Sequence, residues 1–346
     1  MSIDQTIAAL LERVFDGERL SRSDAEGVMG RLMDGELSQM QAAALLAALR
    51  TRGETVEEIV GFARAMRARS VAVTVRTTDP LVDICGTGGT GVSTVNVSTT
   101  AAFVAAAAGV RIAKHGNRGV TKRSGSADLL EALGARIELP ATAVSEAIDE
   151  LGIGFLFARS HHPAMRFVAP IRADLGARTI FNNLGPLTNP AGARRHLLGV
   201  FDPTLTEPFA EVLRGLGLEH ALVVHGDGLD DLSVSGTNVV TELLPDGSIT
   251  TRHLAPEAFG VRSAPRDALL GGGPEENALA TRDILAGRDA GPKRDVVALS
   301  AGAALYLAGR AGDINEGVER AREILASGAA LALLERYVAF TRALVP

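Results

Sequence analysis

The chain has 346 residues, of which 46% are hydrophobic and 22% charged, so it can bury a large core and is not expected to be disordered. Its formal net charge of -6 disfavours general binding to nucleic acid or to an anionic membrane, because both require clustered lysine and arginine. Cys85 is the only cysteine, which excludes an intrachain disulfide and a cysteine-rich zinc site and fits a reducing cytoplasm.

Residues 1 to about 70 lack a strand pattern and predict several short helices. Three pairs of residues have the capping-box spacing that marks a helix start: Ser23 with Glu26, Ser38 with Gln41, and Thr55 with Glu58. Gly53 ends the Ala/Leu-rich segment between the last two of these starts. We therefore expect a small helical domain in this part of the chain.

From Leu81 onward, short β-branched runs alternate with helices that end at glycine, which is the pattern of an α/β layered architecture. The predicted strands are residues 81–85, 110–113, 153–158, 197–201 and 221–225, and the predicted helices between them include 98–108 and 127–133. Beyond about Glu275 the chain returns to long Ala/Leu-rich helices. The Gly- and Pro-punctuated segment from Ala164 to Pro190 is interpreted as a functional crossing between domains.

A glycine-rich loop, residues 86–91, lies between the first predicted strand and the helix at 98–108. Glycine lets backbone N–H groups approach a phosphate closely, and a helix N-terminus adds further donors and a favourable dipole. The loop is not a P-loop, because no Gly-Lys-Ser/Thr follows it. A tight turn between strand and helix would explain the same residues, so the interpretation as an anion site needs support from neighbouring loops.

A second polar loop follows the next predicted strand. It contains Lys114-His115-Gly116-Asn117-Arg118 and, a few residues later, Thr121, Lys122, Arg123, Ser124 and Ser126. In an open α/β sheet the ligand crevice lies beyond the carboxyl ends of the strands, so the two loops are expected to meet at one site. The bases and hydroxyls suit a phosphate and pyrophosphate pocket, and a solvated surface loop is the alternative.

Adjacent carboxylates, Asp230 and Asp231, follow the strand at 221–225. Beside a polyphosphate site such a pair favours Mg²⁺, which prefers hard oxygen ligands and keeps phosphate oxygens and waters in its coordination shell. Taken without the other loops, an ordinary Asp/Gly turn explains the same residues.

Over its whole length the chain resembles the anthranilate phosphoribosyltransferases, a family within the nucleoside-phosphorylase-like superfamily. The resemblance rests on these segments together and in this order: Asp83-Ile84-Cys85-Gly86-Thr87-Gly88-Gly89, Asn96-Val97-Ser98-Thr99, Lys114-His115-Gly116-Asn117-Arg118, Ser124-Gly125-Ser126-Ala127-Asp128, His161-His162-Pro163-Ala164-Met165, Arg172 with Arg178-Thr179-Ile180-Phe181-Asn182, and Leu184-Gly185-Pro186-Leu187-Thr188-Asn189-Pro190. The last three separate the anthranilate enzymes from the phosphorylases of the same fold.

The resemblance implies an α/β fold class, with a small helical N-terminal domain and a larger α/β domain whose central mixed β-sheet is flanked by helices. The helical domain would be residues 1–72, joined by a segment near 168–192, and residues 73–346 would bind phosphoribosyl pyrophosphate (PRPP). It also implies a homodimer that associates through the helical domains.

The resemblance further implies roles for individual residues. The substrates PRPP and anthranilate would be bound by Gly86, Gly89, Thr90, Thr94, Asn96, Val97, Ser98, Thr99, Lys114, His115, Gly116, Asn117, Arg118, Gly119, Val120, Thr121, Lys122, Ser126 and Arg172. Two Mg²⁺ ions per subunit would be held by Ser98, Asp230 and Asp231. Lys114, Asn117 and Arg172 are the expected catalytic residues, and a guanidinium fork independently suits the carboxylate of anthranilate.

The implied reaction joins the phosphoribosyl group of PRPP to the amine of anthranilate, a step in tryptophan biosynthesis. An aromatic amine is already unprotonated near neutral pH, so it needs placement more than a strong base, and no general base is named. His115 is interpreted as a hydrogen-bonding spacer, with proton transfer as the alternative. The pair His161-His162 is expected to shape the anthranilate entrance, while Phe167 and Phe181 are expected to pack.

Two residues depart from the usual family pattern. Thr90 stands where an acid is more common, and Asp231 stands where a glutamate is more common. Both departures concern the PRPP and metal region, so we expect retained activity with altered affinity for Mg²⁺ or PRPP. Two rival functions stay open from the sequence: a pyrimidine nucleoside phosphorylase of the same fold, and a non-catalytic paralogue that binds nucleic acid.

Overall fold

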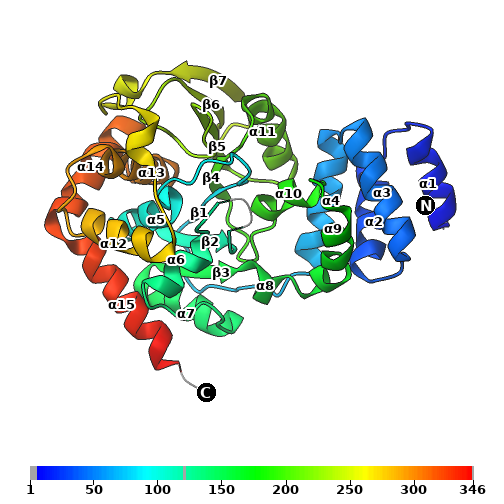
Figure 1. Ribbon diagram of the computed structural model, residues 1–346, viewed down its shortest axis with the longest axis horizontal. Helices are drawn as coiled ribbons and strands as arrows, with labels where there is room; N and C mark the ends of the chain where they lie inside the picture. The colour runs from blue at the N-terminus through cyan, green and yellow to red at the C-terminus, as the bar shows by residue number, and fades with distance from the viewer. Residues whose placement is uncertain (1–5, 120–121, 345–346) are drawn as a thin grey trace.

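The computed structural model describes residues 6–119 and 122–344 of the chain. Figure 1 shows a larger α/β part beside a smaller helical part that contains the N-terminal helices. Two of the predicted substrate-binding residues, Val120 and Thr121, lie outside the described residues. The predicted fold class, helical N-terminal domain plus larger α/β domain, is confirmed.

The N-terminal helices are α1 (Ile7–Phe15), α2 (Arg22–Met33), α3 (Gln39–Arg52) and α4 (Val56–Ala68). The capping boxes at Ser38 and Thr55 are confirmed. The predicted box at Ser23 is wrong: α2 begins earlier in the sequence, and the Ser21 side chain accepts the N–H of Asp24 instead. Ser21 has the extended backbone that a capping residue needs, which the spacing alone does not reveal.

The segment between the strands β3 (Ile153–Phe157) and β4 (Arg195–Gly199) returns to these helices. It contains α8 (Ala158–His161), α9 (Ala169–Leu175), α10 (Phe181–Leu184) and the 3₁₀ turns η1 (Pro163–Phe167) and η2 (Gly185–Leu187). Its apolar side chains Val168, Ile171 and Leu184 are buried in the same hydrophobic cluster as α2, α3 and α4. Figure 1 shows α9 beside the N-terminal helices, so a segment far along the chain completes this part of the molecule.

The α/β part is built on a seven-stranded sheet with the order β3-β2-β1-β4-β5-β6-β7. The strands are β1 (Leu81–Gly86), β2 (Arg111–Gly116), β3 (Ile153–Phe157), β4 (Arg195–Gly199), β5 (His220–Gly226), β6 (Asn238–Leu243) and β7 (Ile249–Leu254). The first five pair in parallel and the last two pair antiparallel, so the sheet is mixed as expected. The chain leaves β1 toward β2 on one side and later returns as β4 on the other.

Both faces of the sheet are covered. The covering helices and remaining 3₁₀ turns are α5 (Val97–Ala107), α6 (Ser126–Ala132), α7 (Ala141–Leu151), α11 (Thr206–Gly215), α12 (Pro274–Leu285), α13 (Pro292–Leu307), α14 (Ile314–Ser327), α15 (Ala329–Ala343), η3 (Pro203–Leu205), η4 (Pro256–Phe259) and η5 (Arg266–Leu269). Alternate residues of β5 serve the two faces: Leu222 and Val224 join the cluster of α5 and α13, whereas Ala221 and Val223 join that of α4 and α11. Both faces therefore contribute to the core.

Among the described residues, no single helix is long and apolar enough to cross a bilayer, and α14 with α15 reaches the length only across a bend of 69°.

Glu58 is a fully buried carboxylate that ties three parts of the helical domain together. It accepts the N–H groups of Leu20 (2.8 Å) and Thr55 (2.8 Å) and pairs with Arg52 at 2.5 Å. Burial acts to raise the pKa of Glu58, but these donors outweigh it and hold the pKa below its usual value. The carboxylate thus supplies capping and an interhelical link at once.

Replacing Glu58 with alanine is expected to lower the free energy of unfolding by roughly 3 kcal/mol, because buried donors lose their acceptor. The neighbouring Glu57, whose pair with Arg22 is exposed, is the matched control and should cost less than about 1 kcal/mol. Because folding lowers the pKa of Glu58, its stabilisation is complete above about pH 4.3, the unfolded-state value, and is lost as the pH falls through the folded-state pKa. Urea unfolding at pH values from 7 to 3 measures both effects. Equal losses of unfolding free energy in the Glu58→Ala and Glu57→Ala variants would contradict the structural role of Glu58.

Candidate active site

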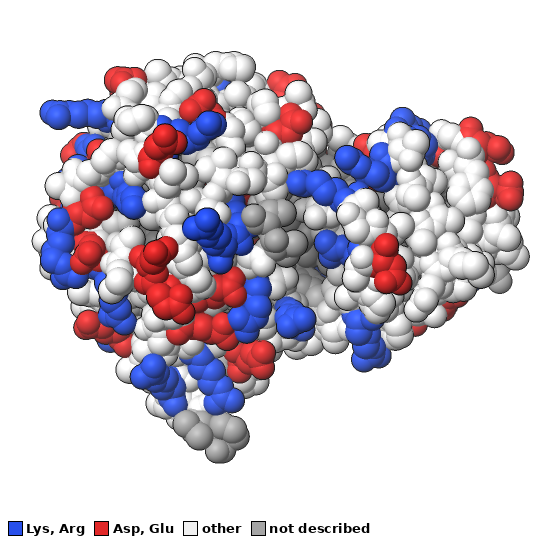
Figure 2. Space-filling model, in the orientation of Figure 1, with Lys and Arg blue, Asp and Glu red and all other residues white. Residues whose placement is uncertain are grey.

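A cavity of about 350 Å³ opens at the carboxyl ends of β1, β2 and β3 and beside the loop that follows β5. This is the edge where the strand order reverses about β1, the usual location of ligand sites in open α/β sheets. Figure 2 shows a hollow between the two parts of the molecule, with Lys and Arg side chains on both of its sides. An anionic ligand is therefore favoured locally although the chain is acidic overall.

The glycine-rich loop after β1 forms one wall. Gly88 and Gly89 have φ of +69° and +89°, a left-handed conformation that other residues rarely adopt. The loop is fixed to β4 through Thr87, whose N–H donates to Gly199 (2.9 Å) and whose hydroxyl accepts the N–H of Phe201 (3.1 Å). Within the described residues the Gly89 N–H has no partner, so it is available to a ligand.

The N-terminus of α5 forms a second wall. The N–H groups of Ser98 and Thr99 in its first turn have no partner in the described part of the chain, and both residues line the cavity. The Asn96 side chain does not cap the helix; its amide donates to Ser124 (3.1 Å) and its oxygen accepts from Asn277 (2.8 Å). Asn96 therefore holds the polar loop after β2 in place beside an exposed helix terminus, a suitable site for phosphate.

Lys114 is a buried cation between these walls. Its Nζ atom donates to the Ile84 carbonyl (2.5 Å) and to the Ser98 hydroxyl (3.3 Å). Burial lowers the pKa of Lys114, an effect that the nearby Cys85 and Asp83 oppose. The predicted strand at 110–113 is too short, since β2 pairs with β3 as far as Gly116, so Lys114 stands within a strand and is held rigidly.

Asp83, Cys85 and His196 bring their potential ligand atoms within 4.8 Å of one another below the cavity. The carboxylate oxygens of Asp83 already accept the N–H of His115 (3.1 Å) and the side-chain amide of Asn189 (2.8 Å). We therefore interpret this group as a hydrogen-bonded link between β1, β2 and the segment before β4 rather than as a metal site.

His115 is neutral and has one unused nitrogen. Its Nδ1 lies 3.1 Å from the Gly185 carbonyl, which only accepts, so the proton is assigned to Nδ1. Burial, with the nearby His162, holds the pKa of His115 well below its usual value. Its Nε2 is buried and has no partner within the described residues, so it is left as an acceptor. The histidine thus has the predicted spacer contact and one free acceptor.

The expectation for His161 and His162 is wrong. Both are buried and neither is among the described residues that line the cavity. The Nδ1 of His161 lies 3.0 Å from the Val71 carbonyl, and the His162 ring lies 5.2 Å from that of His115. The pair therefore supports the cavity from behind instead of shaping its entrance.

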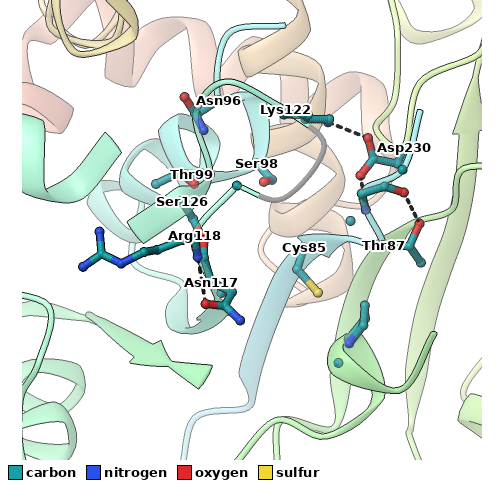
Figure 3. Close-up of a pocket in the computed structure, with 18 of the residues that line it drawn as sticks. Cys85, Thr87, Asn96, Ser98, Thr99, Asn117, Arg118, Lys122, Ser126 and Asp230 are labelled. Carbon is teal, nitrogen blue, oxygen red and sulfur yellow. Dashed lines mark hydrogen bonds and ion pairs between the residues drawn. The ribbon is translucent and has the colours of Figure 1, made fainter. Parts of the chain in front are cut away.

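Asp230 and Asp231 stand opposite the glycine-rich loop. The carboxylate of Asp230 accepts the N–H of Gly88 (2.7 Å) and pairs with Lys122 (2.6 Å), as Figure 3 shows. Burial and the charge of Asp230 raise the pKa of Asp231 to about 7. The Asp231 side chain has no hydrogen-bond partner within the described residues and lines the cavity. The two carboxylates and the Ser98 hydroxyl line the same cavity, and they are hard oxygen donors of the kind that Mg²⁺ prefers.

Arg172, on α9, lines the opposite side of the cavity. Its guanidinium lies 5.7 Å from the centre of the Phe181 ring and makes no ion pair or hydrogen bond with a described residue. Burial lowers the pKa of Arg172 without removing its charge at neutral pH. Asn117 lies in the same cavity; its oxygen accepts the N–H of Arg118 (2.8 Å), which leaves its amide N–H₂ group free in the described structure. Both side chains therefore have unused donors.

Nearly all predicted site residues that the structure describes come together in this cavity. They are Gly86, Gly89, Thr94, Asn96, Val97, Ser98, Thr99, Lys114, His115, Gly116, Asn117, Arg118, Gly119, Lys122, Ser126, Arg172, Asp230 and Asp231. Thr90 is the described exception: its hydroxyl accepts the N–H of Val92 (3.4 Å) and it does not line the cavity. Arg118 points outward in Figure 3, and its guanidinium pairs with Glu131 and Asp128.

Several lining residues were not assigned an individual role from the sequence, although Thr87, Gly88 and Ser124 stand in the predicted anion-binding loops: Cys85, Thr87, Gly88, Val95, Ser124, Gly125, Ala158, Arg178, Phe181, Asn182, Gly185 and Pro186. Phe181, expected only to pack, is buried and also lines the cavity, whereas Phe167 is 38% exposed. Most of the missed residues stand inside the motifs that carried the family resemblance, so the signal was present. The motifs did not reveal which of their side chains point into the cavity.

Comparisons with known proteins agree with this architecture. Residues 8–70 match the helical bundle domain of a glycosyl transferase family, and residues 78–331 match the a/b domain of that family. The anthranilate phosphoribosyltransferase of Rubrobacter xylanophilus is 56% identical over 335 residues, covering 96% of this chain and 97% of the relative.

Two solved structures extend the comparison. The crystal structure of anthranilate phosphoribosyltransferase from Thermus thermophilus has a TM-score of 0.91 and 55% identity, covering 96% of this chain and 99% of that one. The enzyme from Saccharomyces cerevisiae in complex with PRPP and Mg has a TM-score of 0.90 and 28% identity, covering 99% of both chains.

A substitution of Gly199, at the end of β4, tests whether ligand binding depends on the position of the Asp230 and Asp231 carboxylates. A Cβ built there would overlap the Asp230 carbonyl oxygen and lie 3.0 Å from the Asp231 nitrogen. Since overpacking costs about 1–3 kcal/mol, Gly199→Ala is expected to displace this loop and weaken Mg²⁺-dependent pyrophosphate binding by about tenfold or more. Calorimetric titration measures this. Gly27→Ala is the control, because Gly27 lies in α2 and has nothing near its Cβ. A folded Gly199→Ala variant that binds pyrophosphate as the wild type does would contradict a role for Asp230 and Asp231 in Mg²⁺ binding.

Proposed function

Because the chain belongs to the family of anthranilate phosphoribosyltransferases, we propose that its cavity binds PRPP along the α/β wall and anthranilate against α9. The reaction transfers the 5-phosphoribosyl group of PRPP to the amine of anthranilate and gives N-(5-phosphoribosyl)anthranilate and pyrophosphate, in tryptophan biosynthesis. One observation carries the assignment of PRPP to one wall and anthranilate to the other. The guanidinium of Arg172 has no partner among the described residues and faces the cavity, whereas the α/β wall offers backbone donors suited to phosphate.

PRPP is assigned to the free backbone donors and the cations of the α/β wall. The Gly89 N–H and the first turn of α5 offer donors to phosphate oxygens, and Lys114 supplies a fixed charge beside them. The remaining proposed contacts are Gly86, Thr94, Asn96, Val97, Ser98, Thr99, His115, Gly116, Asn117, Arg118, Gly119, Lys122 and Ser126. For Arg118 the proposed contact is limited to its backbone, since its guanidinium is already paired.

Mg²⁺ is assigned to Ser98, Asp230 and Asp231, with two ions per subunit as the proposed number. The donor set fits, because the Asp231 carboxylate faces the cavity without a partner in the described part of the protein. When bound, the metal neutralises charge that develops on the pyrophosphate. Lys122, which holds Asp230 at 2.6 Å, would have to release that carboxylate and turn to the phosphates.

Anthranilate is assigned to Arg172, Asn117 and Gly86. The Arg172 fork matches the carboxylate bidentately, and the ring of Phe181 supports the guanidinium. The amine would then face the ribose C1.

The chemistry follows from these positions. The bond between C1 and the pyrophosphate oxygen breaks with its electron pair staying on that oxygen, the amine nitrogen forms a bond to C1, and one amine proton passes to solvent water. Lys114 and the α5 terminus stabilise the departing negative charge, while Arg172 and Asn117 hold the nucleophile in line. Rate enhancement thus comes from electrostatics and placement, and no strong base is needed.

The organisation of the chain belongs to the same proposal. We assign residues 1–72 with the segment near 168–192 to a helical domain and residues 73–346 to the PRPP-binding domain, and we propose a cytoplasmic homodimer formed through the helical domains. The exposed apolar side chains Phe15 (52%) and Met40 (82%), on α1 and α3, support this surface as the contact.

The test is the loss of anthranilate fluorescence with purified protein, PRPP and Mg²⁺. Arg172→Ala should raise the KM for anthranilate by about 10- to 100-fold with little change for PRPP, because it removes a charged, bidentate contact. Asp230→Asn with Asp231→Asn should instead weaken the dependence on Mg²⁺ and PRPP. No turnover by the wild type at saturating substrates, or an Arg172→Ala effect confined to PRPP, would refute the assignment.

A further inference from the structure

The segment before β4 delivers a second arginine, Arg178, to the cavity. Arg178 lines the cavity, is partly buried, and has no hydrogen-bond or ion-pair partner among residues 6–119 and 122–344. Surface arginines elsewhere in this protein commonly pair with carboxylates, as Arg22 does with Glu57. A guanidinium that is held in a cavity without a counter-charge is prepared for an anionic ligand.

The position of the Arg178 guanidinium is fixed from two sides. Its central carbon lies 3.8 Å from the centre of the Phe201 ring. On the other side it lies against Gly89, where a built Cβ would overlap its Nη1 atom. The Phe201 N–H is itself bonded to Thr87 of the glycine-rich loop, so loop, ring and guanidinium form one unit. Stacking on an aromatic face orients the fork and leaves its edge available for hydrogen bonds.

The electrostatic surroundings narrow the choice of ligand. Burial and the nearby Arg50 lower the pKa of Arg178, while Asp230 acts to raise it, so Arg178 lies within electrostatic range of the carboxylate proposed to hold Mg²⁺. The part of PRPP that must lie beside the metal is its pyrophosphate. The anthranilate carboxylate is assigned elsewhere, to Arg172 on α9.

We propose that Arg178 is a pyrophosphate-binding residue. Its guanidinium, held between the Phe201 ring and the glycine-rich loop, binds the leaving group of PRPP. This inference rests on the proposed function, since it takes PRPP as the substrate. The planar fork suits two oxygens of one phosphate, and the neighbouring Gly89 N–H supplies a further donor.

The consequence for the reaction is a contact that strengthens as bond breaking proceeds. As the bond from C1 to the pyrophosphate oxygen breaks, the electron pair stays on that oxygen and negative charge on the leaving group grows. Arg178 meets this charge from the segment that packs on the helical domain, whereas Lys114 and Asp230 belong to the α/β part. Leaving-group binding therefore joins the two parts of the molecule across the cavity.

The experiment compares Arg178→Gln and Arg178→Lys with Arg166→Gln. Arg166 is the matched control, because it stacks on a phenylalanine (4.7 Å) in the same segment but does not line the cavity. Binding of pyrophosphate with Mg²⁺, of ribose 5-phosphate and of anthranilate is measured by calorimetry, and melting temperatures check folding. Steady-state kinetics then give kcat and both KM values.

Arg178→Gln is expected to weaken pyrophosphate binding by about 10- to 100-fold and to lower kcat, with ribose 5-phosphate and anthranilate binding unchanged. Arg178→Lys should recover only part of the loss, because it keeps the charge and loses the fork. Arg166→Gln should match the wild type. Unchanged pyrophosphate binding in a folded Arg178→Gln variant, or a loss confined to ribose 5-phosphate or anthranilate, would overturn the inference.

Failure of the proposed function gives a different result. A wild-type protein that binds pyrophosphate through Arg178 but does not consume anthranilate would sustain this inference and refute the acceptor. If the wild type consumes anthranilate and the Arg178→Gln variant is equally active, the acceptor is supported and the role of Arg178 is refuted.

Discussion

The site depends on one buried carboxylate, Asp83 on β1. Its two oxygens receive the His115 N–H from β2 and the side-chain amide of Asn189, which also donates to the Ala113 carbonyl at 2.8 Å. All of these groups are buried, so an unmet donor here would be costly. The carboxylate thereby fixes the end of β2, which carries Lys114, relative to the segment that carries Arg172, to which we assign anthranilate. Two substrates that must meet in line need this kind of fixed separation.

Around that fixed point the charges are arranged locally, because the chain as a whole is acidic. Lys114 is held between β1 and α5, Lys122 pairs with Asp230, and Arg172 has no counter-charge among the described residues. The cations that already have partners lie on the α/β wall, to which we assign PRPP and Mg²⁺. Arg172 and Arg178, which have no counter-charge among the described residues, both come from the segment between β3 and β4. We assign the first to the anthranilate carboxylate and the second to pyrophosphate, so this segment offers a free cation to each substrate.

The sequence predicted the fold where a local pattern of apolar residues marks a strand or helix. It predicted the site where polar and charged residues cluster in one motif. Glycine-terminated helices and apolar runs locate β1, β3 and β5 within one or two residues, since burial on both faces leaves a clear signal. The edge strand β7 has an alternating, half-exposed pattern and was not predicted, nor was β6. Arg178 was within a recognised motif but not assigned a role, because its function depends on Phe201 and Gly89, which only the folded chain brings to it.

The two departures from the family pattern carry unequal weight once their positions are known. Thr90 faces its own loop and accepts the Val92 N–H, so its effect should be on loop shape and not on the ligand set. Asp231 faces the cavity, and under the proposed function a carboxylate one carbon shorter than glutamate would have to come closer to reach Mg²⁺. The loop that carries both aspartates lies close against the ends of β1 and β4, because Gly86 and Gly199 have no side chain there and a Cβ at either position would collide with Asp230. The positions of the two carboxylates therefore depend on these glycines.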